Sequence, residues 1–388
     1  MDKRKERQEL ISKVQEYRKS KVLIYFTGDR RPFPSQLAED AVLPLYKHLL
    51  RLKSDEPELK IARIDLFLYT RGGDVSVPWR IVTMIREFCD EFFVLIPYKA
   101  HSAGTMIALG ADKILMGKKA ELSPIDPTLV RAVIGEATVP PPEISVEDVS
   151  SYIAFMRERA NITDQSALAQ VISQLASHLT PLTLGSVNRQ YSHIRLVARK
   201  LLTSRKEKIE ESKLNAIIEA LTEKMYSHGH AIGREEAIEL GLPVVKPGED
   251  LETLIWSLYQ EYENLLQLTE PIDPEELLTR ENKEETFRDN IPLAIIESIN
   301  KLDIFELNSI FRRKRQIPPN PQININLSLG LPPAIDLSKL PQNLQQIIQQ
   351  LMAQVAQTIP QIVQQEIVRQ SPIVGIEGRT FGGRWKEK

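Results

Sequence analysis

The sequence contains a single cysteine, Cys89, among its 388 residues. An internal disulfide is therefore impossible, which points away from the small secreted proteins whose folds depend on disulfides. An unpaired thiol fits a reducing compartment. Cys89 follows a helical pattern and no base stands beside it in the sequence, so we predict that this thiol packs in the interior and is not a nucleophile.

Long apolar runs are also absent. No stretch of about 18 apolar residues occurs, so no membrane-spanning helix is expected. The residues from Asp2 to Arg7 are charged, and no apolar segment typical of a signal peptide follows them. We therefore predict a cytoplasmic location.

Charge of one sign is not in excess, because 50 Lys and Arg residues stand against 52 Asp and Glu residues, a formal net charge of −2. This balance argues against a global basic field of the kind that gathers nucleic acid. We interpret the local basic run at 312–315 as a solvated linker. No Gly-x-x-x-x-Gly-Lys-Ser/Thr loop occurs, so ATP binding is not implied, and we expect neither a cofactor nor a metal.

The first 120 residues alternate between strand and helix patterns. Strand patterns occupy 22–26, 61–69, 92–96 and 113–116, and helix patterns occupy 3–19, 36–52 and 78–88. This order predicts an α/β fold with a mostly parallel sheet. Ligands of such sheets bind beyond the carboxyl ends of the strands, and Gly72, Gly73 and Ser102 fall at such ends.

Gly72 and Gly73 directly follow the predicted strand at 61–69. Glycine lets a backbone approach a substrate closely, and paired N–H groups are what an oxyanion hole needs. Glycines at a strand end are also typical of a plain turn. Both interpretations are open for this segment taken alone.

A small-residue segment, Ala-His-Ser-Ala-Gly-Thr at 100–105, follows the strand pattern at 92–96. A helix pattern opens near Ser102, and the small Ala103 and Gly104 leave room beside the hydroxyl for an acyl group. Such a serine can be a nucleophile, or it can simply cap the helix. Taken alone, the segment favours the cap.

Together these segments resemble the ClpP/crotonase superfamily, and in particular the serine dehydrogenase proteinase family, relatives of signal peptide peptidase A. The resemblance rests on 65–74, 101–116 and 122–129, and more weakly on 181–202 and 228–242. It implies a ClpP/crotonase-like fold, a serine-type endopeptidase acting on a peptide or protein substrate, and a homo-oligomer.

The resemblance also implies roles for individual residues. Ser102 would be the nucleophile, and the N–H groups of Gly73 and Ala103, with Gly72 beside them, would hold the oxyanion. Charge that develops on the tetrahedral intermediate would be stabilised there.

The general base is not settled by the resemblance. ClpP has a histidine in the loop that matches 123–127, where this chain has Asp126, a residue that could orient a base or close a turn. Signal peptide peptidase A uses a lysine, so Lys200 is a candidate if burial lowers its pKa, with an exposed helix lysine as the alternative. His228 is a second candidate, with a structural histidine as its alternative.

We divide the chain into an N-terminal helix at 1–20, a ClpP/crotonase-like peptidase domain at 21–265, a helical extension at 266–317 and a low-complexity, Pro/Gln-rich tail at 318–388. Apolar residues recur in the tail at helical spacing from Leu344 to Ile359. They predict either an amphipathic helix that forms oligomers or a weakly ordered tail.

Two other functions stay open. A crotonase-like enzyme acting on an acyl-CoA thioester would keep the oxyanion hole and would need no serine nucleophile. A non-catalytic oligomeric scaffold would use Ser102 only as a helix cap.

Overall fold

The computed structural model describes residues 3–125, 128–129, 144–145, 151–178, 181–224, 229–317 and 341–388. The chain divides into two compact units. Unit 1 comprises Met1–Ile272, Asn290–Leu307 and Gly382–Lys388, and unit 2 comprises Asp273–Asp289 and Asn308–Phe381. The candidate residues of the site that the structure describes belong to unit 1.

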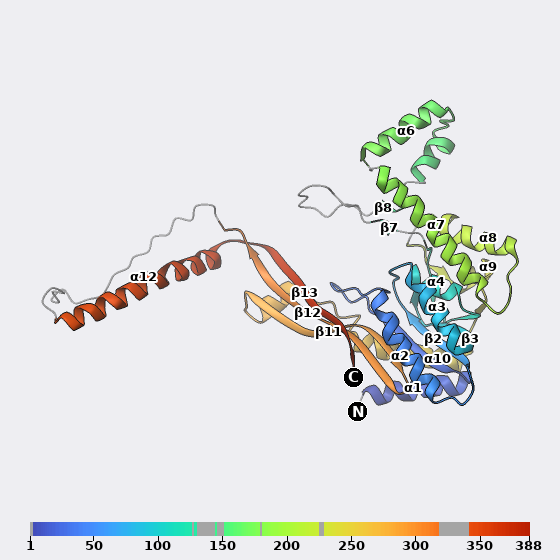
Figure 1. Cartoon of the computed structure of the whole chain (residues 1–388), viewed down its shortest axis with the longest axis horizontal. Helices are drawn as coiled ribbons and strands as arrows, with labels where there is room; N and C mark the ends of the chain where they lie inside the picture. Colours follow the sequence, from blue (N-terminus) through green and yellow to red (C-terminus); the bar gives the residue numbers. More distant parts are fainter. Residues whose placement is uncertain are drawn as a thin grey trace. The chain divides into compact units, whose positions relative to one another are not determined.

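The main sheet has eight strands in the order β10-β5-β3-β2-β1-β11-β12-β13. Strands β2 and β3 of this sheet are labelled in Figure 1. The first five strands of the sheet are parallel neighbours. Four of them match the strands predicted from the sequence, and β10 was not predicted. The five strands are β10 (Val244–Val245), β5 (Lys113–Met116), β3 (Cys89–Ile96), β2 (Ile61–Tyr69) and β1 (Lys21–Thr27). The sixth strand, β11 (Glu285–Ser298), pairs with β1 in the antiparallel sense. The chain is therefore a mixed α/β protein.

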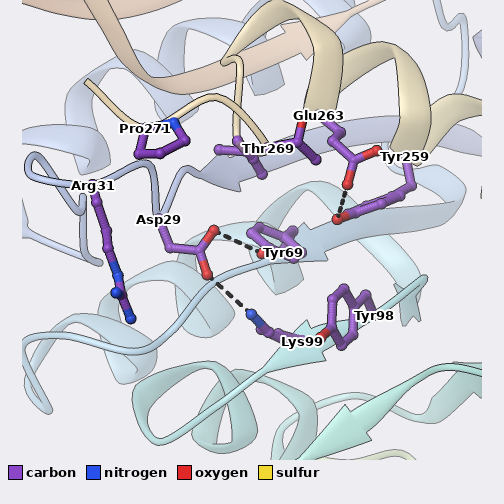
Figure 2. Close-up of a pocket in the computed structure, with 10 residues that line it drawn as sticks. Asp29, Arg31, Tyr69, Tyr98, Lys99, Tyr259, Glu263, Thr269 and Pro271 are labelled. Carbon is purple, nitrogen blue, oxygen red and sulfur yellow. Dashed lines mark hydrogen bonds and ion pairs between the residues drawn. The ribbon is translucent and has the colours of Figure 1, made fainter. Parts of the chain in front are cut away.

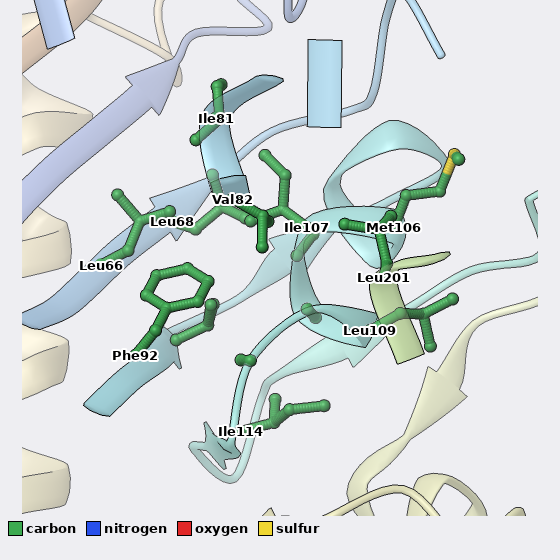
Figure 3. Packing of buried hydrophobic residues seen from close by; sticks show 14 of the residues in the cluster. Leu66, Leu68, Ile81, Val82, Phe92, Met106, Ile107, Leu109, Ile114 and Leu201 are labelled. Atoms are coloured by element: carbon green, nitrogen blue, oxygen red, sulfur yellow. The ribbon is translucent and has the colours of Figure 1, made fainter. Parts of the chain in front are cut away.

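Side chains of successive strand residues enter two different apolar layers, because they point to opposite faces of the sheet. In β2, Leu66 and Leu68 belong to the first layer and Phe67 and Tyr69 to the second. Burying one such side chain stabilises the fold by about 1.5–3 kcal/mol. Figure 3 shows part of the first layer.

The helices that pack in the first layer include α2 (Val42–Ser54), α3 (Val77–Phe88), α4 (Ala103–Leu109) and α7 (Pro181–Thr203). The second layer is closed by α1 (Lys3–Arg18) and α10 (Glu249–Leu265). The predicted helix at 36–52 is shorter at its start, where a 3₁₀ turn (Glu39–Ala41) precedes α2. Pro44 then lies in the first turn of α2, where a missing N–H has no intrahelical acceptor to lose, so it does not break the helix.

Helices dominate the middle of the chain, as predicted. They include α6 (Gln165–His178), α8 (Glu211–Glu219) and α9 (Arg234–Glu239), which is followed by Gly241 at a φ of +85°. No helix in the described part of the chain is both long and apolar enough to span a bilayer.

Cys89 is buried and is the first residue of β3. Burial raises the pKa of its thiol to about 12, so the reactive thiolate is scarce near neutral pH. The prediction that this cysteine packs and is not a nucleophile agrees with this environment.

The predicted helical extension at 266–317 is wrong over most of its length. It contains one short helix, α11 (Pro274–Arg280), followed by the long strands β11 and β12 (Lys301–Arg315). The apolar run in β11 pairs with β1, with Ile295 opposite Phe26 and Ile296 opposite Tyr25. Pairing with a strand about 270 residues earlier decides the structure here, and local pattern does not.

The basic run at 312–315 lies within β12 and is not a linker. Arg315 forms an ion pair with Glu284 at 2.7 Å, and Arg312 donates to the carboxylate of Glu285 at 2.6 Å. These carboxylates neutralise part of the run.

The low-complexity tail is also a wrong expectation for much of its length. Residues 342–370 form the helix α12 (Gln342–Gln370), which agrees with the helical spacing, and β13 (Ile373–Glu387) follows it. Strand β13 takes the outer place in the main sheet, next to β12. Its several glycines, which are rare in strands, hid it from sequence patterns.

A chain of buried hydrogen bonds and ion pairs connects α2 to the end of β11 and the start of β12. Nδ1 of His48 lies 2.8 Å from Oγ of Ser298, and Nε2 lies 3.0 Å from Oδ2 of Asp303. Asp303 also contacts the Lys301 ammonium at 3.0 Å, and that ammonium pairs with Glu387 as well. His48 is fully buried and Ser298 is 1% exposed. A substrate could not reach these buried serine, histidine and aspartate side chains. Their role is therefore to stabilise the fold.

Burial lowers the pKa of His48 to about 4, against the opposing effect of Asp303. In the unfolded chain the histidine pKa is about 6.5, so between pH 6.5 and 4 the unfolded state binds more protons than the folded state. The free energy of unfolding therefore decreases as the pH falls through that window, by up to about 3 kcal/mol. We expect His48→Gln to flatten this loss in urea unfolding measured from pH 7 to 4. The exposed His193→Gln variant should keep the wild-type slope, and an unchanged slope in His48→Gln would contradict this assignment.

Candidate active site

Ser102 stands between the short strand β4 (Lys99–Ala100) and helix α4, beyond the carboxyl end of β3. Its backbone has φ +49° and ψ −111°, a conformation that residues other than glycine rarely adopt. The residue occupies the N-cap position, but its side chain makes no capping hydrogen bond. The interpretation of Ser102 as a simple cap therefore fails, and its half-buried hydroxyl has no hydrogen-bond partner among the described residues.

Two buried hydroxyl groups fix the backbone around Ser102. The N–H of Ser102 donates to Oγ of Ser123 at 2.8 Å, and the N–H of Ser123 donates to Oγ1 of Thr105 at 3.0 Å. The Thr105 hydroxyl lies 2.8 Å from the carbonyl oxygen of Ala100. These bonds join the loop after β6 (Glu121–Leu122) to both sides of the Ser102 turn and hold the strained residue in place.

Backbone hydrogen bonds on both sides of Leu37 hold the segment of Gly72 and Gly73 against it; we call this contact the Leu37 clamp. The N–H of Leu37 donates to the carbonyl of Gly72 at 2.7 Å, and the N–H of Asp74 donates to the carbonyl of Leu37 at 2.9 Å. Gly73 has a φ of +149°, and a Cβ there would lie 2.2 Å from the carbonyl oxygen of Leu37. Only glycine allows this approach.

Gly72 lies directly against the serine. It has a φ of +109°, and a Cβ at this position would be 2.8 Å from Cβ and 3.3 Å from Oγ of Ser102. Its N–H donates to Oγ1 of Thr70 at 3.0 Å. The two predicted segments, far apart in the sequence, are therefore neighbours in the structure.

The N–H groups of Gly73 and Ala103 donate to no other described residue. The N–H of Gly72 is already used by Thr70, so Gly72 supplies space and not a donor. Two unoccupied backbone donors next to a free hydroxyl can stabilise an anion that forms on a bound carbonyl.

Three residues were predicted to act as the general base or to orient it, and Lys200 is the one among them that the structure describes. Asp126 and His228 lie outside the described residues. Lys200 is exposed on α7, and its ammonium lies 5.5 Å from the centre of the Trp79 ring. No hydrogen bond links Lys200 to Ser102 in the described part of the chain.

Two other histidines near these segments already have carboxylate partners. Nε2 of His101 lies 3.1 Å from Oε1 of Glu121, and burial lowers the pKa of His101 against the pull of that carboxylate. Nε2 of His230 lies 2.8 Å from Oε1 of Glu236. No group of three or more His, Cys, Asp or Glu side chains suited to a metal occurs in the part of the chain that the structure describes.

Sequence patterns missed the residues that support the site. Leu37, Thr105 and Ser123 contact the two predicted segments through backbone and hydroxyl groups. Thr105 belongs to the small-residue segment and could have been noticed for that reason. Nothing local in the sequence distinguishes Leu37 from any other buried leucine.

Comparisons with known proteins agree with the resemblance seen in the sequence. Residues 1–139 match the family model of the ClpP-like SDH-type serine proteinases. The chain is 30% identical to the uncharacterized protein MJ0137 of Methanocaldococcus jannaschii over 227 residues, 56% of this chain and 68% of that protein. It is 26% identical to the uncharacterized protein MJ1495 of the same organism over 209 residues, 52% of this chain and 61% of that protein.

Two solved structures are also similar. ClpP1 from Listeria monocytogenes aligns with a TM-score of 0.33 and 13% identity, over 61% of this chain and 98% of that chain. A mutant of the 1510-N membrane-bound stomatin-specific protease aligns with a TM-score of 0.34 and 16% identity, over 56% of this chain and 79% of that chain.

The contact at Gly73 gives a test of the site's backbone. Gly73→Ala places a methyl group 2.2 Å from the Leu37 carbonyl oxygen, so we expect a loss of stability of about 2 kcal/mol or more in chemical denaturation. Gly185→Ala is the matched control, because that helical glycine has nothing within 4 Å and should become slightly more stable. Equal stability of the two variants would show that the Leu37 clamp is not rigid.

Proposed function

The chain belongs to the family of ClpP-like SDH-type serine proteinases, and we propose that it is a serine-type endopeptidase that cleaves peptide bonds through an acyl-enzyme on Ser102. The observation that carries the proposal is the free Ser102 hydroxyl beside the unoccupied N–H groups of Gly73 and Ala103, within the described part of the chain. A hydroxyl that only supported the fold would be expected to have a partner.

In the proposed reaction, Oγ of Ser102 attacks the carbonyl carbon of the scissile peptide bond, and a base accepts the hydroxyl proton. The carbonyl oxygen becomes an oxyanion, which accepts hydrogen bonds from Gly73 and Ala103. Collapse of this intermediate breaks the C–N bond, and the leaving amine takes a proton from the conjugate acid of the base. Water then hydrolyses the ester and frees Ser102.

Lys200 and His228 remain the proposed bases, and Asp126 a residue that would orient one of them. A lysine needs a lowered pKa to accept a proton near neutrality, which requires burial or a nearby positive charge. Lys200 is exposed in the free chain, so it would act only after bound substrate or a neighbouring subunit covers it. A homo-oligomer and a cytoplasmic location stay predictions from the resemblance and from the composition.

The free hydroxyl weighs against the scaffold alternative, in which Ser102 would be a cap. A crotonase-like reaction on an acyl-CoA thioester would use the same two N–H groups without a nucleophile. Labelling by a fluorophosphonate separates the two, because that reagent needs an activated serine.

We expect Ser102→Ala to abolish fluorophosphonate labelling and to lower peptide hydrolysis by at least about 10³-fold, since the acyl-enzyme cannot form. Labelling is measured by gel fluorescence and hydrolysis with an unstructured protein such as casein. Ser54→Ala, at an exposed serine of α2, should keep both activities. Wild-type protein that is not labelled and does not cleave, but binds acyl-CoA, would replace the peptidase proposal with the crotonase-like one.

The base can be identified from two variants and their pH profiles. Loss of the true base, in Lys200→Met or His228→Gln, should lower kcat/KM by about 10²–10⁴-fold. A histidine base predicts that activity falls below about pH 6.5, and a lysine base predicts a fall at higher pH. Lys208→Met, at an exposed lysine, is the control. Retention of more than about a tenth of the activity by both variants would exclude both residues.

A further inference from the structure

A pocket of about 280 Å³ lies in unit 1 on the α10 side of the sheet (Figure 2). Its volume is smaller than that of most drug-sized ligand sites and suits a single large side chain. The rings of Tyr69, Tyr98 and Tyr259 and the apolar groups of Leu268 and Pro271 line it. Tyr69 and Tyr259 are almost completely buried.

The pocket is built on the same two backbone segments as the candidate active site. Tyr69 is followed by the turn of Gly72 and Gly73, and Lys99, another lining residue, is three positions before Ser102. Three residues span at most about 10 Å. The two segments are bonded to each other, since the N–H of Thr70 donates to the carbonyl of Lys99 at 2.9 Å. An extended peptide whose scissile bond meets Ser102 can therefore place a nearby side chain in the pocket.

Three of the four charged groups of the pocket already have partners. The Asp29 carboxylate accepts from the hydroxyl of Tyr69 and from the ammonium of Lys99, each at 3.0 Å. The Glu263 carboxylate accepts from the hydroxyl of Tyr259 at 3.0 Å. Burial, and the carboxylate beside each ring, raise the pKa values of Tyr69 and Tyr259, so both hydroxyls stay protonated as donors.

The fourth charged group is Arg31, and it differs from the others. Its side chain is exposed, and its guanidinium has no hydrogen bond, ion pair or ring contact with any other described residue. Because Lys99 and Asp29 compensate each other, the free charges of the pocket are Arg31 and Glu263. Glu263 already accepts one hydrogen bond, while all five N–H groups of Arg31 are available.

We propose that this pocket is a substrate subsite that takes an acidic side chain of the peptide, with its carboxylate on Arg31 and its methylene groups against the tyrosine rings. The subsite rests on the proposed peptidase function. A planar guanidinium binds a carboxylate through two parallel hydrogen bonds, which gives direction as well as charge. An extended chain advances about 3.3 Å per residue, so the acidic residue lies about two to four positions from the scissile bond.

The test measures peptide binding to the inactive Ser102→Ala protein. The probes are octapeptides of alanine and serine, acetylated and amidated, in which one Glu, Gln or Lys is moved through the positions. We expect Glu at one position to bind about tenfold more tightly than Gln. Arg31→Gln removes this preference, and Arg31→Glu reverses it in favour of Lys. Arg31 is exposed and its guanidinium has no partner among the described residues, so these variants should fold normally, and Arg51→Gln is the control at an exposed arginine of α2.

Two further arms sharpen the result. Glu263→Gln should tighten binding of the Glu peptide, since it removes a like charge and keeps an acceptor for Tyr259. Peptides with a free C-terminal carboxylate test whether that group takes the place of the side chain. Equal binding of Glu, Gln and Lys peptides, or no peptide binding, would overturn the subsite. A preference for Lys that depends on Glu263 would overturn the acidic specificity and show that the pocket takes a basic side chain.

The subsite and the peptidase function can fail separately. Cleavage of these peptides by wild-type protein without any dependence on Arg31 would leave the function and remove the subsite. A preference for Glu that depends on Arg31, in a protein that cleaves none of the peptides, would leave the subsite and remove the function.

Discussion

The site depends on two glycines that approach neighbouring segments of the chain more closely than any residue with a side chain could. Gly73 lies against Leu37 and Gly72 lies against Ser102, each closer than a Cβ would allow. This contact brings the ends of β2 and β4 together and leaves two N–H groups beside one hydroxyl. Holding Ser102 at φ +49° costs of order 1–3 kcal/mol, and the buried hydrogen bond from its N–H to Ser123 offsets part of that cost.

The sequence predicted the parallel strands well because each is a short apolar run bounded by glycine, proline or charged residues. It failed where strand identity depends on distant partners. β11 forms beside β1, and β13 forms at the outer place in spite of its glycines. Helical and strand patterns cannot be separated for such segments until the neighbouring strand is known.

The same distinction applies to the candidate site. Gly72, Gly73 and Ser102 belong to compact local segments, and Gly72 lies directly against Ser102 in the structure. The pocket could not be foreseen, because Asp29, Tyr69, Tyr98 and Tyr259 come from four separate parts of the chain. No sequence motif surrounds Arg31. That its guanidinium can bind a ligand becomes evident only from the structure, where the neighbouring charged groups are paired with other partners.

The proposed chemistry divides between groups that titrate and groups that do not. The oxyanion donors are backbone N–H groups and the nucleophile is a serine hydroxyl, so none of them changes protonation near neutral pH. His101, the titratable neighbour in sequence, is engaged with Glu121. In the proposed chemistry, the base is the reacting group whose protonation changes near neutral pH. In this proposal, a change of base would alter the pH profile and leave the backbone N–H donors of Gly73 and Ala103 where they are.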